Sequence, residues 1–122
     1  MTKYESARFA YHYAPRGHSK EAVTRYLTQM LNNAERFCEC EEVYTMAKCH
    51  CLFDFNLIAH NAVKKAATFA KTYSDWLFVC LAAPTGTPLC EKAFEKAEEK
   101  VKDEYELKHL LFFYKRKIKS NE

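Results

Sequence analysis

The chain has 122 residues, of which 48% are hydrophobic and 15% aromatic, and its formal net charge is +3. This composition predicts a single folded domain over residues 1–122 and excludes a disordered chain. No run approaches the length of about 18 apolar residues that is typical of a membrane span, and the first residues lack the apolar core of a secretory signal, so we expect no membrane partner.

The first predicted elements are a strand and a helix. Aromatic residues stand at every second position of residues 7–13, at Phe9, Tyr11 and Tyr13, and a period of two is typical of a β-strand. A turn is predicted over residues 15–18. Ser19 then opens a helix as its N-cap, because apolar residues recur at helical spacing at Val23, Tyr26, Leu27, Met30, Leu31, Ala34 and Phe37.

The stretch CECEEVYTMAKCHC, residues 38–51, contains two Cys-x-Cys pairs and can be interpreted in two ways. Nothing in residues 37–55 breaks a helix. However, Val, Cys, Phe and Tyr are frequent there and alanine is scarce, which favours strands. We therefore predict a β-hairpin over residues 37–55, with a helix as the alternative.

Three further elements follow. Residues 57–73 have apolar residues at intervals of four and predict an amphipathic helix. Residues 74–83, SDWLFVCLAA, have apolar residues at both odd and even positions, as in a strand buried on both faces. Thr87 as N-cap and Pro88 at the first helical position open a long last helix that continues nearly to the end. No internal repeat is apparent.

The predicted order is strand, helix, strand, strand, helix, strand, helix. Its first six elements follow the βαββαβ pattern of a ferredoxin-like fold. The expected fold class is therefore α/β (α+β), with a central antiparallel sheet, helices on both faces and a long C-terminal helix.

Two stretches resemble the origin-binding domain of polyomavirus large T antigen. RFAYHYAPRGHSKEAVTRYLTQM is similar to that domain's first strand and helix, and KCHCLFDFNLIAHNAVKKAATFAKTYSDWLFVCLAAP is similar to its next strand, DNA-binding loop, helix and strand. The similarity covers about residues 7–83 and lies more in residue type than in identity. The papillomavirus replication initiator shares this fold, and rolling-circle nickases are structurally related.

The resemblance implies sequence-specific binding of double-stranded DNA at a viral replication origin. Two loops would make the contacts, at residues 2–8 and 56–65. The DNA-binding residues expected from them are Lys3, Arg8, His60, Asn61, Lys64 and Lys65. Asn61 departs from the family, which has an arginine there, so the family's DNA target is in doubt. The resemblance also implies a helicase domain in the same polypeptide and a location in the host nucleus, with self-association on DNA left open.

The rolling-circle nickases suggest a metal-dependent alternative, for which this chain lacks a complete residue set. The third predicted strand offers one histidine, His50, where the nickases have two. The following helix offers Thr68, Phe69 and Lys71 where a Tyr-x-x-Lys pattern with a nucleophilic tyrosine is needed. We therefore expect no catalytic residue, no cofactor and no enzymatic activity in this domain.

Two further patterns have competing interpretations. The cysteines at positions 38, 40, 49 and 51 suggest a zinc site, but Cys-x-Cys spacing is rarer than Cys-x₂-Cys. On a hairpin the four thiols would share the inner face of the sheet as small core residues, so no metal site is predicted. The cations at positions 115, 116, 117 and 119 resemble a nuclear-localisation patch, yet cations also suit the C-terminus of a helix.

The leading hypothesis is a non-catalytic origin-binding domain of a viral initiator. The runner-up is a small helical viral or phage protein that uses an aromatic surface to bind another protein. A nearly all-helical structure would remove the sheet and favour this second hypothesis.

Overall fold

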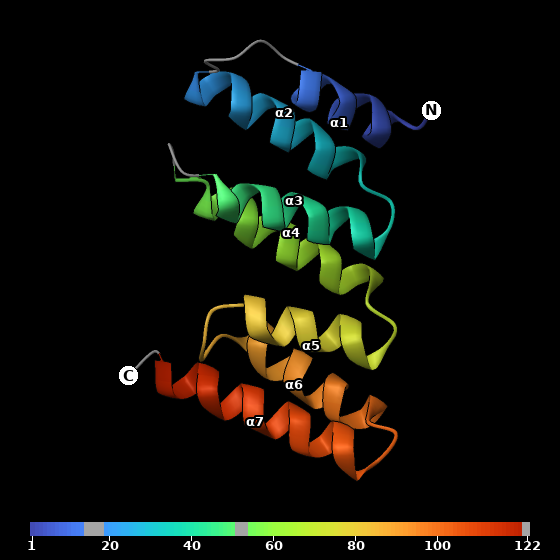
Figure 1. Ribbon diagram of the computed structural model, residues 1–122, viewed down its shortest axis with the longest axis vertical. Coiled ribbons are helices and arrows are strands. Elements are labelled where there is room, and N and C mark those ends of the chain that lie inside the picture. Colours follow the sequence, from blue (N-terminus) through green and yellow to red (C-terminus); the bar gives the residue numbers. More distant parts are fainter. Residues whose placement is uncertain (14–18, 51–53, 121–122) are drawn as a thin grey trace. The chain divides into compact units, whose positions relative to one another are not determined.

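The computed structural model describes residues 1–13, 19–50 and 54–120. The described part of the chain is helical and contains no strand (Figure 1). Its helices are α1 (Lys3–Tyr13), α2 (Lys20–Asn33), α3 (Phe37–Cys49), α4 (Asn56–Phe69), α5 (Tyr73–Ala82), α6 (Pro88–Lys100) and α7 (Glu104–Ser120). The chain divides into two compact units, residues 1–66 and 67–122.

The odd-numbered helices all carry an acidic residue at their third position, and these four residues are called the first-turn acids: Glu5, Glu39, Asp75 and Glu106. Three of them accept a hydrogen bond from the backbone N–H of the residue four positions earlier, at 2.8 Å for Glu39, 3.0 Å for Asp75 and 2.8 Å for Glu106. Such bonds satisfy amide donors that a helix start leaves open, and the negative charge also complements the helix dipole.

The predicted α/β fold is wrong, and the two outer strands are both helices. Residues 7–13 belong to α1, and residues 74–83 lie largely in α5. In α1 the residues that face the core are Tyr4 and Ala7, at helical spacing, whereas Phe9 is exposed. A strand would have one buried face and one solvated face, with the aromatic residues on one of them. The burial observed in α1 follows a helical spacing instead.

The predicted β-hairpin at residues 37–55 is also wrong, and the helical alternative is correct for α3. The single long last helix is wrong as well, because it is interrupted between α6 and α7. Asp103 starts α7, where its side chain accepts a hydrogen bond of 2.9 Å from the Glu106 backbone N–H. The predicted turn at residues 15–18, and Cys51 and Phe53 of the hairpin, lie outside the described residues.

Three helix predictions are confirmed, at α2, α4 and the start of α6. The Ser19 hydroxyl accepts from the Ala22 N–H at 3.1 Å, and the Thr87 hydroxyl accepts from the Cys90 N–H at 3.3 Å, with Pro88 as the first helical residue. These caps could be predicted because a side-chain oxygen at this position supplies an acceptor that the first turn needs.

In residues 1–66, α1 packs against α2, and α2 contacts α3. The fully buried side chains that fill this core include Val23, Leu27, Met30, Cys40, Val43 and Val63. Burying a side chain of this kind contributes about 1.5–3 kcal/mol to stability. The apolar faces of the helices, rather than a sheet, therefore hold this unit together.

In residues 67–122, α5 packs against α6, and α7 contacts both. Cys80, Cys90, Ala93 and Leu110 are fully buried in this unit. Small residues on α6 allow close approach of its neighbours. Among the helices that the structure describes, none has the length and apolar character needed to cross a membrane.

Candidate functional site

A tyrosine joins α1 to α3. The Tyr4 hydroxyl donates to the Glu39 carbonyl oxygen at 3.3 Å and also contacts the Glu42 carboxylate. Burial and the neighbouring Glu42 raise the pKa of Tyr4 well above its ordinary value. Arg8, one turn further along α1, forms an ion pair of 2.9 Å with Glu42. These contacts fix which side of α1 faces α3 and which side faces solvent.

An equivalent joint connects α5 to α7. The Tyr73 hydroxyl donates to the Glu106 carbonyl oxygen at 3.2 Å and lies 3.1 Å from Nδ1 of His109. Burial, followed by the nearby Glu106, raises the pKa of Tyr73. In both units the tyrosine therefore contacts the carbonyl of a first-turn acid and the side chain three residues beyond it. The two contacts are alike in their partners, although Tyr4 stands one residue before the first-turn acid of its helix and Tyr73 stands two residues before.

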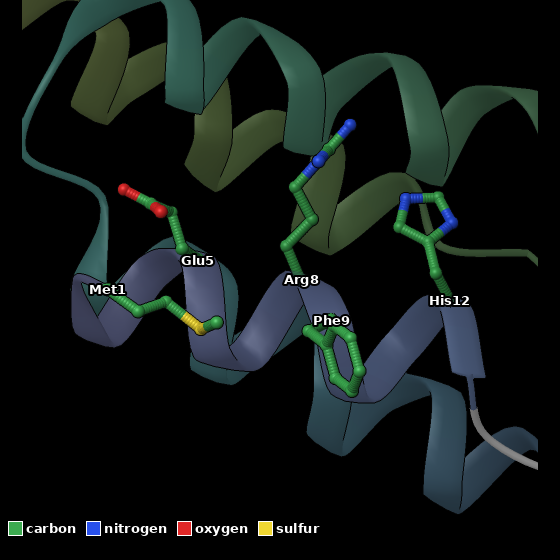
Figure 2. A pocket seen from close by; sticks show the side chains of 5 residues that line it. All are labelled: Met1, Glu5, Arg8, Phe9 and His12. Atoms are coloured by element: carbon green, nitrogen blue, oxygen red, sulfur yellow. The ribbon is translucent and has the colours of Figure 1, made fainter.

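The exposed side of α1 carries a cavity of about 660 Å³. Its lining residues are Met1, Glu5, Arg8, Phe9 and His12 (Figure 2). Glu5, Arg8 and His12 project from one side of the helix, and Phe9 projects from another. At the polar edge of this cavity, Arg8 is paired with Glu42 of α3. The arrangement combines apolar surface with a few placed polar groups, as ligand-binding sites do.

Most exposed large hydrophobic side chains lie on two helices. Among the described residues these side chains are Met1, Phe9, Leu57, Tyr105 and Phe112. Met1 and Phe9 belong to the cavity on α1, whereas Tyr105 and Phe112 lie on α7. Exposed aromatic side chains that gather on one element mark interaction surfaces more often than isolated ones do.

A second hollow, of about 520 Å³, lies along α2. Its described lining residues are all polar or charged: Lys20, Glu21, Thr24, Arg25, Thr28 and Gln29. The cavity on α1 is the stronger candidate because it alone of these two includes exposed large apolar side chains.

The residues expected to bind DNA are divided between α1 and α4. Lys3 and Arg8 lie on α1, and Arg8 is the one expected residue that lines the cavity. Its ion pair with Glu42 places its charge toward α3. Arg8 thus has a protein partner, and its side chain is about half exposed.

On α4, Asn61 and Lys64 are exposed and His60 is partly exposed. Lys65 is different, because its ammonium group donates to the carbonyl oxygens of Leu31 at 2.6 Å and Asn32 at 3.3 Å. It therefore stabilises the C-terminus of α2, where cations are favoured. The two segments expected to be DNA-binding loops, residues 2–8 and 56–65, instead lie largely in α1 and α4.

Of the cysteines in the Cys-x-Cys pairs, the structure describes Cys38, Cys40 and Cys49, and these three do not share a face. Cys38 and Cys49 are exposed on α3, and Cys40 is fully buried. Burial raises the pKa of the Cys40 thiol to about 11, so this thiol remains protonated as a core residue. Within the described ranges, no group of three or more His, Cys, Asp or Glu side chains is placed to hold a metal ion.

A buried thiol cluster in the second unit was not expected from the sequence. The Cys90 thiol lies 3.4 Å from the Cys80 carbonyl oxygen, and the Lys117 ammonium group is 3.3 Å from the Cys90 sulfur. Lys117 also donates to the carbonyl oxygens of Cys80, at 2.7 Å, and Ala83. Lys117 is thus a cap of α5, while Lys115, Arg116 and Lys119 are exposed. No signal in the sequence distinguished Lys117 from its neighbours.

The described chain is an α-helical protein in which α1 packs against α2 and α5 packs against α6. It has a cavity on α1 and exposed aromatic side chains on α1 and α7. The chain matches no family model, no curated protein and no solved structure. The residues themselves therefore provide the basis for a functional proposal.

Proposed function

We propose that this chain is a protein-interaction module that acts by binding and not by catalysis, and that the cavity on α1 is its binding site. The observation that carries the proposal is the exposure of Phe9 and Met1 in a cavity whose polar edge includes Arg8, which is paired with Glu42. Apolar side chains of a partner would be buried against Phe9, and burial of an aromatic anchor supplies much of the energy of protein interfaces.

The partner segment that best fits this site is helical and amphipathic. A helix can place apolar side chains against Met1 and Phe9 while its polar side chains meet Glu5 and His12. The contact of Tyr4 with α3 shows that α1 already packs against a helix. Helix-on-helix packing is therefore the mode of binding that this element supports.

Selection from a displayed library of amphipathic helical peptides tests the proposal. We expect the wild-type chain to enrich a peptide that binds the Phe9→Ser variant at least 10-fold more weakly, because truncating an aromatic anchor costs about 2 kcal/mol or more. Leu57→Ser is the matched control, since Leu57 is also exposed but lies on α4 outside the cavity. Equal binding by wild type and Phe9→Ser would refute the assignment of this site.

Binding of origin DNA, which the resemblance implied, stays a prediction. The same holds for a helicase domain in the polypeptide and for a location in the host nucleus. The exposed Lys3 and Lys64 are consistent with contact to phosphate groups, but Arg8 and Lys65 have protein partners. Binding to random duplexes that weakens steeply as salt is added would support this second function.

A further inference from the structure

The exposed side of α7 combines cations with aromatic rings. Six exposed residues follow this side of the helix at intervals of three and four positions. They are called the outer face of α7: Tyr105, Lys108, Phe112, Lys115, Arg116 and Lys119. Tyr105 is 77% exposed and Phe112 is 60% exposed. The outer face therefore presents two large aromatic side chains among four cations.

The opposite side of α7 is used for packing within its own unit. Leu110 is 0% exposed, and the ring centroid of Tyr114 lies 4.3 Å from that of Phe94 on α6. The Lys117 ammonium group donates to the Cys80 carbonyl oxygen of α5. The apolar side of α7 and one of its cations are thus engaged with α5 and α6.

The cations of the outer face are available to an anionic partner. Among the described residues, Lys115, Arg116 and Lys119 form no ion pair. Lys108 lies 3.3 Å from Glu104, but the two side chains are 75% and 80% exposed, and an exposed pair of this kind contributes little to stability. A phosphate group can therefore replace Glu104 as the partner of Lys108.

Each aromatic ring of the outer face has a cation one helical turn away. Lys108 stands three residues after Tyr105 and four residues before Phe112. Lys115 and Arg116 follow Phe112 by three and four residues. The two aromatic positions are about 10.5 Å apart along the helix axis, since a helix rises about 1.5 Å per residue. Single strands of nucleic acid bind to surfaces of this composition, because bases stack on the rings while cations contact the phosphates.

We infer that the outer face of α7 binds single-stranded nucleic acid, with bases stacked on Tyr105 and Phe112 and phosphates bound by the four cations. A helix that lies in a lipid surface inserts an apolar side and keeps its cations on the opposite side. In α7 the apolar side is packed against α5 and α6, and the exposed rings lie among the cations. This arrangement favours a nucleic acid over an anionic membrane. The outer face shares no residue with the cavity on α1, so the two sites can be tested independently.

Fluorescence polarisation of a labelled oligothymidine of about 16 nucleotides tests this site in the full chain. Phe112→Ala should weaken binding at least about 5-fold, because one stacked base is lost. Leu57→Ala is the matched control, since Leu57 is an exposed apolar residue of α4, and it should bind like wild type. Unlabelled oligouridine should compete with the labelled strand, because DNA and RNA share the phosphates and the base faces.

An abasic strand of the same length separates stacking from charge. It keeps the phosphates and lacks the bases, so wild type should bind it at least about 5-fold more weakly than oligothymidine. Phe112→Ala and wild type should bind the abasic strand equally.

The salt dependence tests the cations. Lys119→Gln should reduce the slope of log affinity against log salt concentration by about 0.7, because one phosphate contact to a single strand is lost. Lys92→Gln is the matched control, since Lys92 is an exposed cation of α6, and it should leave the slope unchanged.

Three results would overturn the assignment of this face. The first is equal binding of oligothymidine by wild type and Phe112→Ala. The second is equal binding of the complete and the abasic strand by wild type, because stacking would then contribute nothing. The third is binding of phosphatidylserine vesicles through Phe112 without binding of oligothymidine, which would assign the face to a membrane.

Discussion

Two lysines that resemble solvated surface residues in the sequence cap helices in the structure. Lys65 bonds the last carbonyl groups of α2, and Lys117 bonds those of α5. The final carbonyls of a helix lack intrahelical donors, so a partly buried ammonium group satisfies them and complements the helix dipole. Their role at these helix ends is therefore structural. The resemblance to the origin-binding domain had implied that Lys65 binds DNA.

Substituting Lys65 should lower stability, whereas substituting its neighbour should not. Lys65→Met keeps the length of the side chain and removes its two hydrogen bonds to α2, which should reduce the free energy of unfolding by about 1–2 kcal/mol. Lys64→Met is the matched control, since Lys64 is exposed, and it should change stability by less than about 0.5 kcal/mol. Urea denaturation measures both, and equal losses would contradict the capping role.

The buried thiols predict how stability depends on alkaline pH. Burial, together with the adjacent Cys90, raises the pKa of Cys80 to about 12, and the Lys117 ammonium group opposes this shift. A folded-state pKa above the unfolded value means that the protonated thiol favours the folded state. This contribution is fully present below the unfolded pKa of about 9 and is lost as pH rises toward about 12.

Cys80→Ala should therefore lose less stability than wild type between neutral and alkaline pH. The comparison concerns the change with pH, because the cavity left by the substitution lowers stability at every pH. Cys49→Ala serves as control, since Cys49 is exposed and its removal should leave the alkaline loss unchanged. Urea denaturation across this pH range measures the loss of stability. If the Cys80→Ala and Cys49→Ala variants lost the same stability at alkaline pH, this result would contradict a raised pKa of Cys80.

At the scale of helices, α2, α4 and the start of α6 could be predicted because several local signals agree there. Ser19 and Thr87 are caps at the start of apolar patterns of helical period. Helix α5 could not be predicted in the same way, because its residues are apolar on nearly every side. A short apolar run of this kind is compatible with a buried strand or a buried helix.

The first-turn acids are a signal that could have corrected this error. Thr72 and Asp75 form a capping box at the start of α5, and Thr2 and Glu5 exchange side-chain contacts at the start of α1. A capping residue followed by an acid three positions later predicts a helix start. The alternating aromatic residues of residues 7–13 indicated a strand, and the helix-start signal of Thr2 and Glu5 had no part in that prediction.

Part of the candidate site was accessible from the sequence and part was not. Arg8 was selected for its charge, and it does line the cavity. Phe9 was expected on a β-strand and is instead exposed on a helix, and no motif in the sequence singled out the exposed Phe112. Periodicity shows which residues share a face, but whether another helix covers that face depends on tertiary packing.

At the scale of the whole molecule, the same tyrosine joint occurs in both units. Tyr4 and Tyr73 each connect an odd-numbered helix to the next one through the carbonyl of a first-turn acid. Repeated helical pairs bury their apolar faces against neighbouring pairs. The exposed Phe9 in the cavity on α1 is where we propose that this helical chain binds a protein partner.

The helical identity of α1 and α5 supports the whole account, because both the tyrosine joints and the exposed faces depend on it. The measurement that tests it most directly is the ¹³Cα chemical shift of each residue in solution. For residues 7–13 and 74–82 we predict shifts displaced from random-coil values in the helical direction. Displacement in the strand direction over these two segments would contradict the account and restore the ferredoxin-like sheet.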